Sequence, residues 1–460
     1  MVNEIFRRYL EEAIGSENAL VAFSAFDKPA PTSVRLNPFK PGCSFEGRQT
    51  EWNPHGVVLA DRPQFTLDPY LHAGAYYVQD SSSMFVGHVF RKCLPMSGDR
   101  RPLRVLDLCA APGGKSTDLA ASLREACGDG FILVSNEVMK QRAAVLADNM
   151  ALWGDPNVVV TSDDPRAFAA LDGYFDVIVA DVPCSGEGMF RKDEEAQRQW
   201  SEDNVALCQA RQRRIIADMW PALRSGGVLI YSTCTFNRYE NDGNVAWIAE
   251  ELGADVITSE DWGYGDSGVI KTELGYSLVP GHVEGEGQYC AALRKTSDDC
   301  SRTYDSRQGG RKGRDKAPRS AAPLPESLKD LFSEDVVLKQ KGDMVIAVPA
   351  AISSQVRMLE SFLHVMAAGC AVGTMKGQTL VPDADLALSL MLAPDAFPYA
   401  DVDLQTALAF LHKDAILPGD AAKGYVTVRY EGLPLGFVKN IGNRCNNLHP
   451  QGRRIRMDIR

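Results

Sequence analysis

The sequence predicts an α/β fold in which a parallel sheet lies between layers of helices. Three observations support this prediction. From about residue 104 to residue 295, short apolar runs alternate with helical stretches, as expected of βαβ units. A turn of small residues, CAAPGGK, follows the first apolar run. Two later apolar runs are each followed within a few residues by a cysteine, Cys184 and Cys234.

The predicted strands of this central region are short and apolar. They cover residues 104–108, 131–135, 158–161, 176–180 and 228–231, and the helices between them include residues 117–126 and 140–152. In the usual order of such sheets, the fourth and fifth strands are neighbours. Because ligands bind outside the carboxyl ends of parallel strands, the residues after each strand are the first candidates for a functional site.

Changes in composition divide the chain into five parts. The first part predicts a mixed α/β module with an amphipathic helix from Glu4 to Ile14. A stretch rich in Ser, Arg, Gly, Asp and Pro predicts a flexible basic linker. Near the end, two β-rich runs at 424–430 and 433–439 flank a Glu-Gly turn and predict a hairpin. We therefore expect domains at 1–95, 96–295, 326–395 and 396–460, with the linker at 296–325.

Composition limits the class of protein. The 460 residues are 45% hydrophobic and carry a formal net charge of −11. We expect no membrane span and no signal peptide, because long apolar runs are absent and the first residues are acidic and amphipathic. The 11 cysteines include no Cys-x-x-Cys pair, so we expect neither disulfides nor a metal site, and a cytoplasmic location. Local charge differs from the average, since residues 421–460 hold eight Lys and Arg against two acids.

The turn after the first strand predicts a nucleoside-binding loop. Gly113 and Gly114 lack Cβ atoms, so a ligand can approach the backbone and meet the free N–H groups of the next helix. A P-loop is excluded because Cys109 stands where its first glycine is required, and the dinucleotide spacing GxGxxG is also absent. Glu137 follows the second strand, where such folds hold a ribose, and Asp164 follows the third.

The two cysteines beyond the fourth and fifth strands predict chemistry through sulfur. Cys184 lies in the run DVPCSGEGMFRKD, and Cys234 lies in STCT. Neighbouring strands are about 5 Å apart, so both thiols should face one ligand. A free cysteine elsewhere behaves as a small hydrophobic residue, which is what we expect of Cys43, Cys93, Cys127, Cys208, Cys290, Cys300, Cys370 and Cys445.

Taken together, the runs at 106–115, 181–193 and 232–235 resemble the RNA cytosine-5 methyltransferases of the Sun/NSUN type, and above all their bacterial rRNA branch, RsmF. Residues 279–287 are similar to the last hairpin of its catalytic domain, and residues 442–456 to its PUA-like tail. The resemblance implies a Rossmann-like, class I S-adenosylmethionine-dependent methyltransferase domain. An N-terminal α+β module of RNA-binding type would precede it, and a C-terminal PUA-like α+β RNA-binding region would follow.

The resemblance also implies roles for single residues. Cys234, in the Thr-Cys motif, would be the nucleophile, and Cys184, in the Pro-Cys motif, would assist product release. S-adenosylmethionine would be held by Cys109, Ala110, Ala111, Pro112, Gly113, Gly114, Lys115, Glu137, Asp164 and Asp181. Two positions depart from the commonest family pattern, Val182 in place of Ala and Gln288 where an aromatic residue is common. We expect neither to touch a catalytic atom.

The chemistry explains these residue types independently of the family. Cytosine C5 is a poor nucleophile, but a thiolate that adds to C6 makes C5 enamine-like, so that it can attack a methyl sulfonium. Only the thiolate attacks, so the site must favour the ionised form of one cysteine. Asp181 is expected to hydrogen-bond the N3/N4 edge of the ring and to stabilise the shift of charge.

A base inside a duplex cannot reach a recessed thiol, so the target must be unpaired or flipped out. The rest of the protein should then hold RNA by its backbone and shape. The basic candidates for RNA contact are the tail after Lys423, the loop residues Arg191 and Lys192, and Arg35. The aromatic candidates for stacking on bases, each also a typical core residue, are Tyr76, Tyr77 and Phe190.

The expected substrate is small-subunit (16S) rRNA, either free or within a partly assembled subunit, and the expected enzyme is a monomer that binds neither DNA nor membranes. Three alternatives compete on the sequence alone, of which a DNA methyltransferase is disfavoured by the intact Thr-Cys motif. A tRNA cytosine-C5 methyltransferase would share every catalytic residue. A non-catalytic ribosome assembly factor with a vestigial fold is disfavoured by the complete set of Cys184, Cys234 and Asp181.

Overall fold

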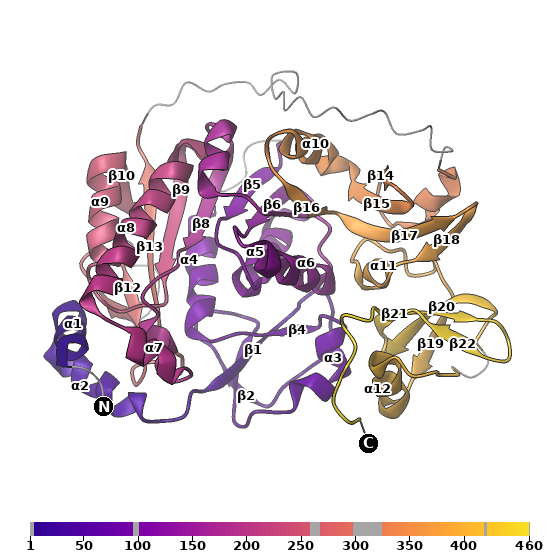
Figure 1. Cartoon of the computed structure of the whole chain (residues 1–460), viewed down its shortest axis with the longest axis horizontal. Helices are drawn as coiled ribbons and strands as arrows, with labels where there is room; N and C mark the ends of the chain where they lie inside the picture. The colour runs from indigo at the N-terminus through magenta and orange to yellow at the C-terminus, as the bar shows by residue number, and fades with distance from the viewer. Residues whose placement is uncertain (1–3, 95–100, 258–266, 298–323, 418–420, 460) are drawn as a thin grey trace.

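The computed structural model describes residues 4–94, 101–257, 267–297, 324–417 and 421–459. Its centre is a ten-stranded sheet with the order β11-β12-β13-β9-β8-β5-β6-β7-β16, in which β10 pairs with β13 off this path (Figure 1). The five strands from β9 to β7 are parallel, and β13 and β16 are added antiparallel on either side. The predicted parallel sheet and the predicted contact between the fourth and fifth strands are both confirmed.

The predicted strands are found within a few residues of their expected bounds, except β9, which begins five residues before its predicted start. The prediction missed these residues because they include the polar, glycine-rich run RSGG, which lacks the apolar pattern of a buried strand. The strands of the central sheet are β5 (Leu103–Asp107), β6 (Phe131–Asn136), β7 (Val158–Thr161), β8 (Phe175–Asp181), β9 (Leu223–Thr233), β10 (Ala254–Ile257), β11 (Ile270–Lys271), β12 (Tyr276–Leu278), β13 (Gln288–Lys295) and β16 (Val365–Ala368). The helices that accompany it are α4 (Phe85–Cys93), α5 (Gly114–Cys127), α6 (Lys140–Trp153), α7 (Glu194–Gln199), α8 (Glu202–Met219), α9 (Asp242–Leu252) and α10 (Ser353–Phe362).

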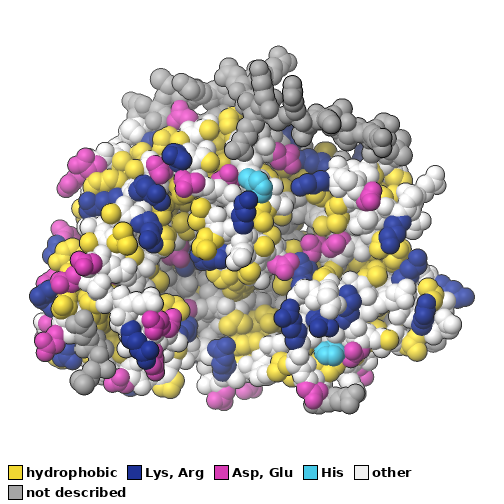
Figure 2. Space-filling view, viewed as in Figure 1, with side chains coloured by type: hydrophobic (Ala, Val, Ile, Leu, Met, Phe, Trp, Pro, Cys, Tyr) yellow, Lys and Arg dark blue, Asp and Glu magenta, His cyan; other side chains and the backbone are white. Residues whose placement is uncertain are grey.

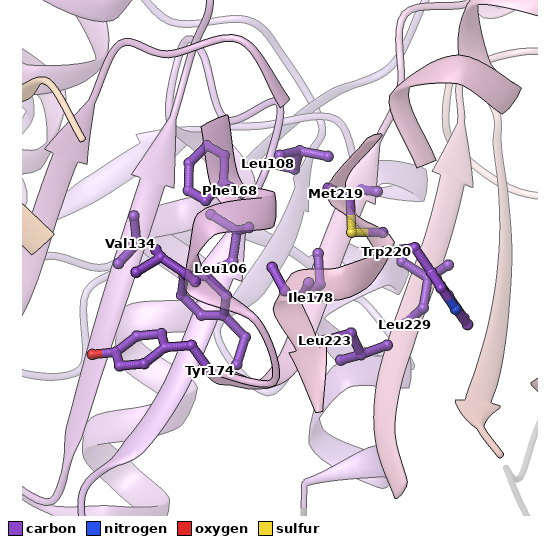
Figure 3. Packing of buried hydrophobic residues seen from close by; sticks show 14 of the residues in the cluster. Leu106, Leu108, Val134, Phe168, Tyr174, Ile178, Met219, Trp220, Leu223 and Leu229 are labelled. Atoms are coloured by element: carbon purple, nitrogen blue, oxygen red, sulfur yellow. The ribbon is translucent and has the colours of Figure 1, made fainter. Parts of the chain in front are cut away.

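Both faces of the central sheet are buried, as the continuous apolar strands require. Leu106, Ile178 and Leu229 belong to the hydrophobic cluster on one face, where they pack beneath residues such as Phe168 (Figure 3). Their strand neighbours point the other way, and Val105 joins the cluster on the opposite face. This packing fixes the strand ends from which the functional side chains project.

The N-terminal module packs against the loops at the carboxyl end of the central sheet. Helix α1 has the predicted bounds and buries Phe6 against Phe190 and Trp200, with ring centroids 5.0 and 5.6 Å apart. The four strands of the module have the order β2-β3-β1-β4. The elements of the module are α1 (Glu4–Ile14), α2 (Ser16–Phe26), β1 (Thr32–Leu36), β2 (Gly47–Gln49), β3 (Gly56–Leu59), α3 (Pro69–His72) and β4 (Tyr76–Val78).

The chain beyond residue 324 forms two further four-stranded sheets, drawn in orange and yellow in Figure 1. The predicted hairpin is confirmed as β20 and β21, whose turn residues Glu431 and Gly432 both have positive φ. The elements of this region outside the central sheet are β14 (Val336–Lys341), β15 (Met344–Pro349), β17 (Cys370–Lys376), β18 (Thr379–Pro382), α11 (Ala384–Leu388), β19 (Tyr399–Val402), α12 (Leu404–His412), β20 (Gly424–Tyr430), β21 (Leu433–Asn440) and β22 (Cys445–Asn447).

The segment expected to form a small intermediate domain at 326–395 also contributes to the central sheet, because its strand β16 pairs with β7. The proposed domain boundaries themselves stay a prediction. The predicted linker at 296–325 lies almost wholly outside the described residues, as does Cys300. In the described part of the chain, no helix combines the length and the hydrophobicity needed to cross a bilayer.

Candidate active site

The ends of β8 and β9 bring the two predicted cysteines together. These strands are parallel neighbours, with Asp181 opposite Ser232 in the register, so the loops that follow them start side by side. The Sγ atoms of Cys184 and Cys234 lie 3.0 Å apart, and both residues are partly exposed. Two thiols this close can share one hydrogen bond and can reach the same ligand atom.

Cys184 holds its own proton firmly. The hydrogen bond to Cys234 and burial raise the pKa of the Cys184 thiol well above its ordinary value. Cys184 therefore stays protonated at neutral pH, and its S–H can donate to the sulfur of Cys234. A sulfur that receives a hydrogen bond is better able to hold negative charge, which is the state that a nucleophile needs.

The carboxylate of Asp181 is fixed by three donors at the entrance to the two cysteine loops. Lys115 Nζ lies 2.8 Å from Oδ2, while the Ser232 hydroxyl and the Gln288 amide donate to Oδ1 at 2.8 and 3.0 Å. Gln288 therefore contacts a predicted catalytic residue, against the expectation from the sequence. Strand β13 pairs with β9, which places the first side chain of β13 directly over the carboxyl ends of β8 and β9.

Two buried glutamates tie the cysteine loops to each other. Glu187, three residues beyond the Pro-Cys motif, accepts hydrogen bonds from the backbone N–H groups of Phe236 and Asn237, at 2.6 and 3.0 Å. Glu240, from beyond the Thr-Cys motif, accepts from the Ser185 N–H at 3.1 Å. Each loop thus anchors the other, which holds the sulfur pair in place. No periodicity or motif in the sequence indicates these contacts, because each joins residues about 50 positions apart.

The predicted cofactor loop joins β5 to α5. Gly113 has a φ of 116° and caps the N-terminus of α5, a conformation that favours glycine. Beside it, Lys115 reaches Asp181, so the loop and the cysteine site share one ion pair. Asp107, at the end of β5, is fully buried, and within the described residues its Oδ1 lacks a hydrogen bond of normal geometry. In the sequence, Cys109, Ala110, Ala111 and Pro112 belong to the loop between β5 and α5, and the Ser116 hydroxyl of α5 donates to Asp107 Oδ2 at 2.7 Å.

The two predicted acids lie at the ends of the next strands. Glu137 follows β6, its side chain is only 4% exposed, and it pairs with Arg142 at 3.1 Å. Asp164 follows β7, is exposed, and accepts a hydrogen bond from the Arg166 N–H. A glycine loop, a helix N-terminus and a carboxylate at the second strand end are the features that hold an adenosine moiety in such folds, so the residues present fit S-adenosylmethionine.

Two of the predicted RNA contacts are wrong. Arg35 is fully buried, where its guanidinium donates to Gln79 and Thr117 and joins the N-terminal module to α5. Arg191 is only 6% exposed, and it pairs with Glu286. Lys192 is 44% exposed, and it remains a candidate. Charge in the sequence does not distinguish a buried structural cation from one on the surface.

The three aromatic candidates differ in how exposed they are. Tyr76 and Phe190 are buried in the core, and Tyr76 donates to Asp68 at 2.8 Å. Tyr77 is partly exposed and lines a cavity described below. Of the three, Tyr77 keeps a face that a base could reach.

Comparison with known proteins identifies the family of the chain. The family model described as "16S rRNA methyltransferase RsmB/F" matches residues 95–294. The N-terminal domain of 16S rRNA methyltransferase RsmF matches residues 2–81, and the methyltransferase RsmF PUA domain matches residues 399–455. The ribosomal RNA small subunit methyltransferase F of Enterobacter sp. (strain 638) is 31% identical over 97% of this chain and 94% of its own length.

The chain belongs to the 16S rRNA methyltransferase RsmB/F family. It is therefore an S-adenosylmethionine-dependent RNA methyltransferase with a PUA-type RNA-binding segment near its C-terminus. A second RsmF relative, from Salmonella newport (strain SL254), is 32% identical over 82% of this chain and 78% of its own length.

Solved structures confirm the fold of this RsmB/F-type chain. A methyltransferase homolog protein from Pyrococcus horikoshii has a TM-score of 0.52 and 24% identity over 64% of this chain and 95% of its own. NSun6 from the same organism, solved with SFG, has a TM-score of 0.53 and 19% identity over 64% of this chain and 98% of its own. At these identities, the likeness concerns the fold alone.

Proposed function

We propose that this enzyme methylates C5 of a cytosine in small-subunit rRNA through a covalent bond between Cys234 and C6 of the base. The observation that carries the proposal is the sulfur pair at the ends of β8 and β9, 3.0 Å apart and next to a carboxylate held by three donors. A nucleophile, a second thiol and an anion at one strand-end site match the needs of cytosine activation.

In the first step, the Cys234 thiolate adds to C6 of the cytosine. The electron pair of the C5–C6 double bond moves to C5. C5 then forms the new bond to the methyl carbon while the bond from that carbon to the donor's sulfur breaks and leaves its electron pair on the sulfur. Asp181 is suited to accept a hydrogen bond from the N4 amino group and to keep the ring oriented. Its own three donors hold the carboxylate in place, so it need not reorganise while the charge on the ring changes.

S-adenosylmethionine, when bound, supplies the methyl group from its sulfonium. Glu137 would hold its ribose, and the backbone from Cys109 to Gly114 would contact the rest of the nucleoside. The remaining predicted residues Lys115, Asp164 and Asp181 border the same region from the α5, β7 and β8 ends. We assign these roles on position and chemistry.

In the last step, the proton on C5 is lost to a solvent base, the double bond reforms, and the C6–sulfur bond breaks. The electron pair returns to Cys234 as a thiolate. Cys184 is protonated and adjacent, so its S–H can stabilise the departing thiolate by a hydrogen bond. We assign Cys184 to this release step and Cys234 to the attack, in agreement with the Pro-Cys and Thr-Cys motifs.

We further propose that the enzyme is a cytoplasmic monomer and that its substrate is 16S rRNA within a partly assembled small subunit. The two relatives described above are named ribosomal RNA small subunit methyltransferase F, and the match to the Enterobacter protein spans 97% of this chain. The experiment that tests the function is transfer of a labelled methyl group to free 16S rRNA, small-subunit particles and tRNA. Bisulfite sequencing of both RNAs from cells with and without the gene then locates the cytosine. Methylation confined to tRNA would overturn the choice of substrate.

A further inference from the structure

A cavity of about 450 Å³ lies where three parts of the chain meet. Tyr77 of β4 forms one wall, Asn149 and Leu152 of α6 form the second, and Leu435 of β21 with the segment near Arg453 forms the third. Most of its lining is apolar or aromatic. Its volume falls within the range of sites that bind small molecules.

The cavity adjoins the back of the cofactor loop. The Asn149 amide donates to the Pro112 carbonyl at 2.7 Å, and a Cβ placed on Gly114 would lie 3.3 Å from the Tyr77 ring. Two cavity walls therefore touch the loop between β5 and α5. In the part of the chain that the structure describes, the Oδ1 of Asn149 accepts no hydrogen bond, so it is available to a ligand.

The third wall is locked in position. Arg453 donates to Asp148 on α6 at 2.8 Å and to Asp385 on α11 at 2.7 Å, and its side chain is only 12% exposed. Arg453 and Asp148 both border the cavity and form an ion pair there, so the cation is already matched by acids of the protein. A largely apolar cavity with an amide acceptor and no unpaired cation in its described lining suits a nucleobase better than a phosphate.

Positive charge lies just outside the cavity. Arg454 and Arg456 follow the wall segment and are exposed, where they can meet the phosphates on either side of a captured base. Figure 2 shows hydrophobic side chains in the recessed middle of this face, with Lys and Arg side chains gathered beside them.

We propose that this cavity binds an unpaired nucleotide of the RNA substrate, one that is distinct from the target cytosine, by stacking it on Tyr77 and hydrogen-bonding it to Asn149. The proposal rests on the RNA methyltransferase function. Because the N-terminal module, the cofactor domain and the PUA-type region each supply a wall, all three would contact the same nucleotide. Binding would then depend on the shape of the RNA around it.

The test is RNA affinity, which does not depend on turnover. Leu152→Phe adds bulk inside the cavity, and Tyr77→Leu removes the stacking face. Each should raise the Kd for a 16S rRNA fragment with unpaired nucleotides about tenfold, consistent with the loss of one stacked base. In Leu152→Phe, at a wall residue that is not one of those described as touching the cofactor loop, the Kd for S-adenosylmethionine should not change. Leu207→Phe, at an exposed position on α8, is the matched control and should bind RNA as the wild type does.

Failure of the nucleotide site and failure of the proposed methylation reaction give different results. If Leu152→Phe and Tyr77→Leu both bind the fragment with wild-type affinity, the nucleotide site is overturned whatever the activity. If they lose affinity while the wild-type enzyme transfers no methyl group to cytosine, the site stands and the proposed reaction falls. A 2-aminopurine placed in turn at the unpaired positions should show quenching at one position in the wild type. The same quenching in Tyr77→Leu would also overturn the proposal.

Discussion

The side-chain amide of Gln288 donates to Asp181 Oδ1 at 3.0 Å and to the carbonyl of Thr233 at 2.9 Å. It therefore joins the carboxylate at the end of β8 to the residue that precedes Cys234 on β9. Gln288 is only 2% exposed, so neither bond competes strongly with water. Gln288 is therefore a positioning residue: it holds Asp181 and the Cys234 loop in place without contacting the substrate itself.

Gln288→Met should lower kcat about tenfold and leave the KM for RNA and the Kd for S-adenosylmethionine nearly unchanged. Methionine has a similar length and keeps the packing, but it cannot donate to Asp181, and a buried hydrogen bond to a charged group contributes about 1.5–3 kcal/mol. Single-turnover methyl transfer measures the step directly. Gln288→Glu replaces the donating amide with a carboxylate that faces the Asp181 carboxylate, so this variant should be slower still. A wild-type rate in both variants would mean that Gln288 contributes only packing.

Cys234→Ala should abolish methyl transfer, and Cys184→Ala should accumulate a covalent enzyme–RNA adduct. Without the Cys184 S–H beside it, the departing Cys234 thiolate loses its hydrogen-bond donor, so elimination slows while attack still occurs. The adduct appears as a slowly migrating band on a denaturing gel after incubation with RNA and S-adenosylmethionine.

The control for the adduct is the double variant, in which both cysteines are alanine and no band should form. Cys127→Ser, a partly exposed thiol at the end of α5, should behave as the wild type. Trapping in Cys234→Ala instead of Cys184→Ala would reverse the two roles.

Local patterns were sufficient to predict the part of this fold that positions the site. The loop that contains Gly113 and the two cysteines each follow an apolar run, which indicates where the strands end. Because β8 and β9 are parallel neighbours, Cys184 then lies beside Cys234. The hairpin of β20 and β21 was predictable for a similar reason, because a Glu-Gly turn between β-rich runs is a local signal.

Contacts between distant segments were not predictable from one sequence. Gln288 reaches Asp181 only because β13 returns antiparallel beside β9, and nothing near residue 288 encodes that partner. Arg35 was wrongly assigned to RNA because its partners, Gln79 and Thr117, lie far along the chain. The pairing of β16 with β7 is a third case, since it joins segments about 200 residues apart.

Asp107→Asn should stabilise the protein more at pH 8 than at pH 5. Burial raises the pKa of Asp107 from 3.8 to about 7, so the folded state holds a proton that the unfolded state releases between these values. The wild type therefore loses stability as the pH rises towards 7, by up to about 1.4 kcal/mol per pH unit, and asparagine removes this loss. Urea unfolding of both proteins at several pH values measures it.

The difference in unfolding free energy between Asp107→Asn and the wild type should grow up to about pH 7 and then stay constant. Asp61→Asn, at an exposed acid of the N-terminal module, controls for the removal of one negative charge. A difference that does not vary with pH would show that Asp107 is ionised throughout.

Arg454→Ala combined with Arg456→Ala should weaken RNA binding and reduce its dependence on salt. Both arginines are exposed, and each lost phosphate contact should lower the slope of log Kd against log salt by about 0.7 for single-stranded RNA. Point changes are preferable to removal of residues 421–460, because Ile455 is buried in the C-terminal core and Arg453 holds α6 and α11. S-adenosylmethionine affinity should be unchanged, and Lys329→Ala, at an exposed lysine outside the PUA-type segment, should leave the slope as it is. An unaltered slope in the double variant would remove this tail from the RNA-binding surface.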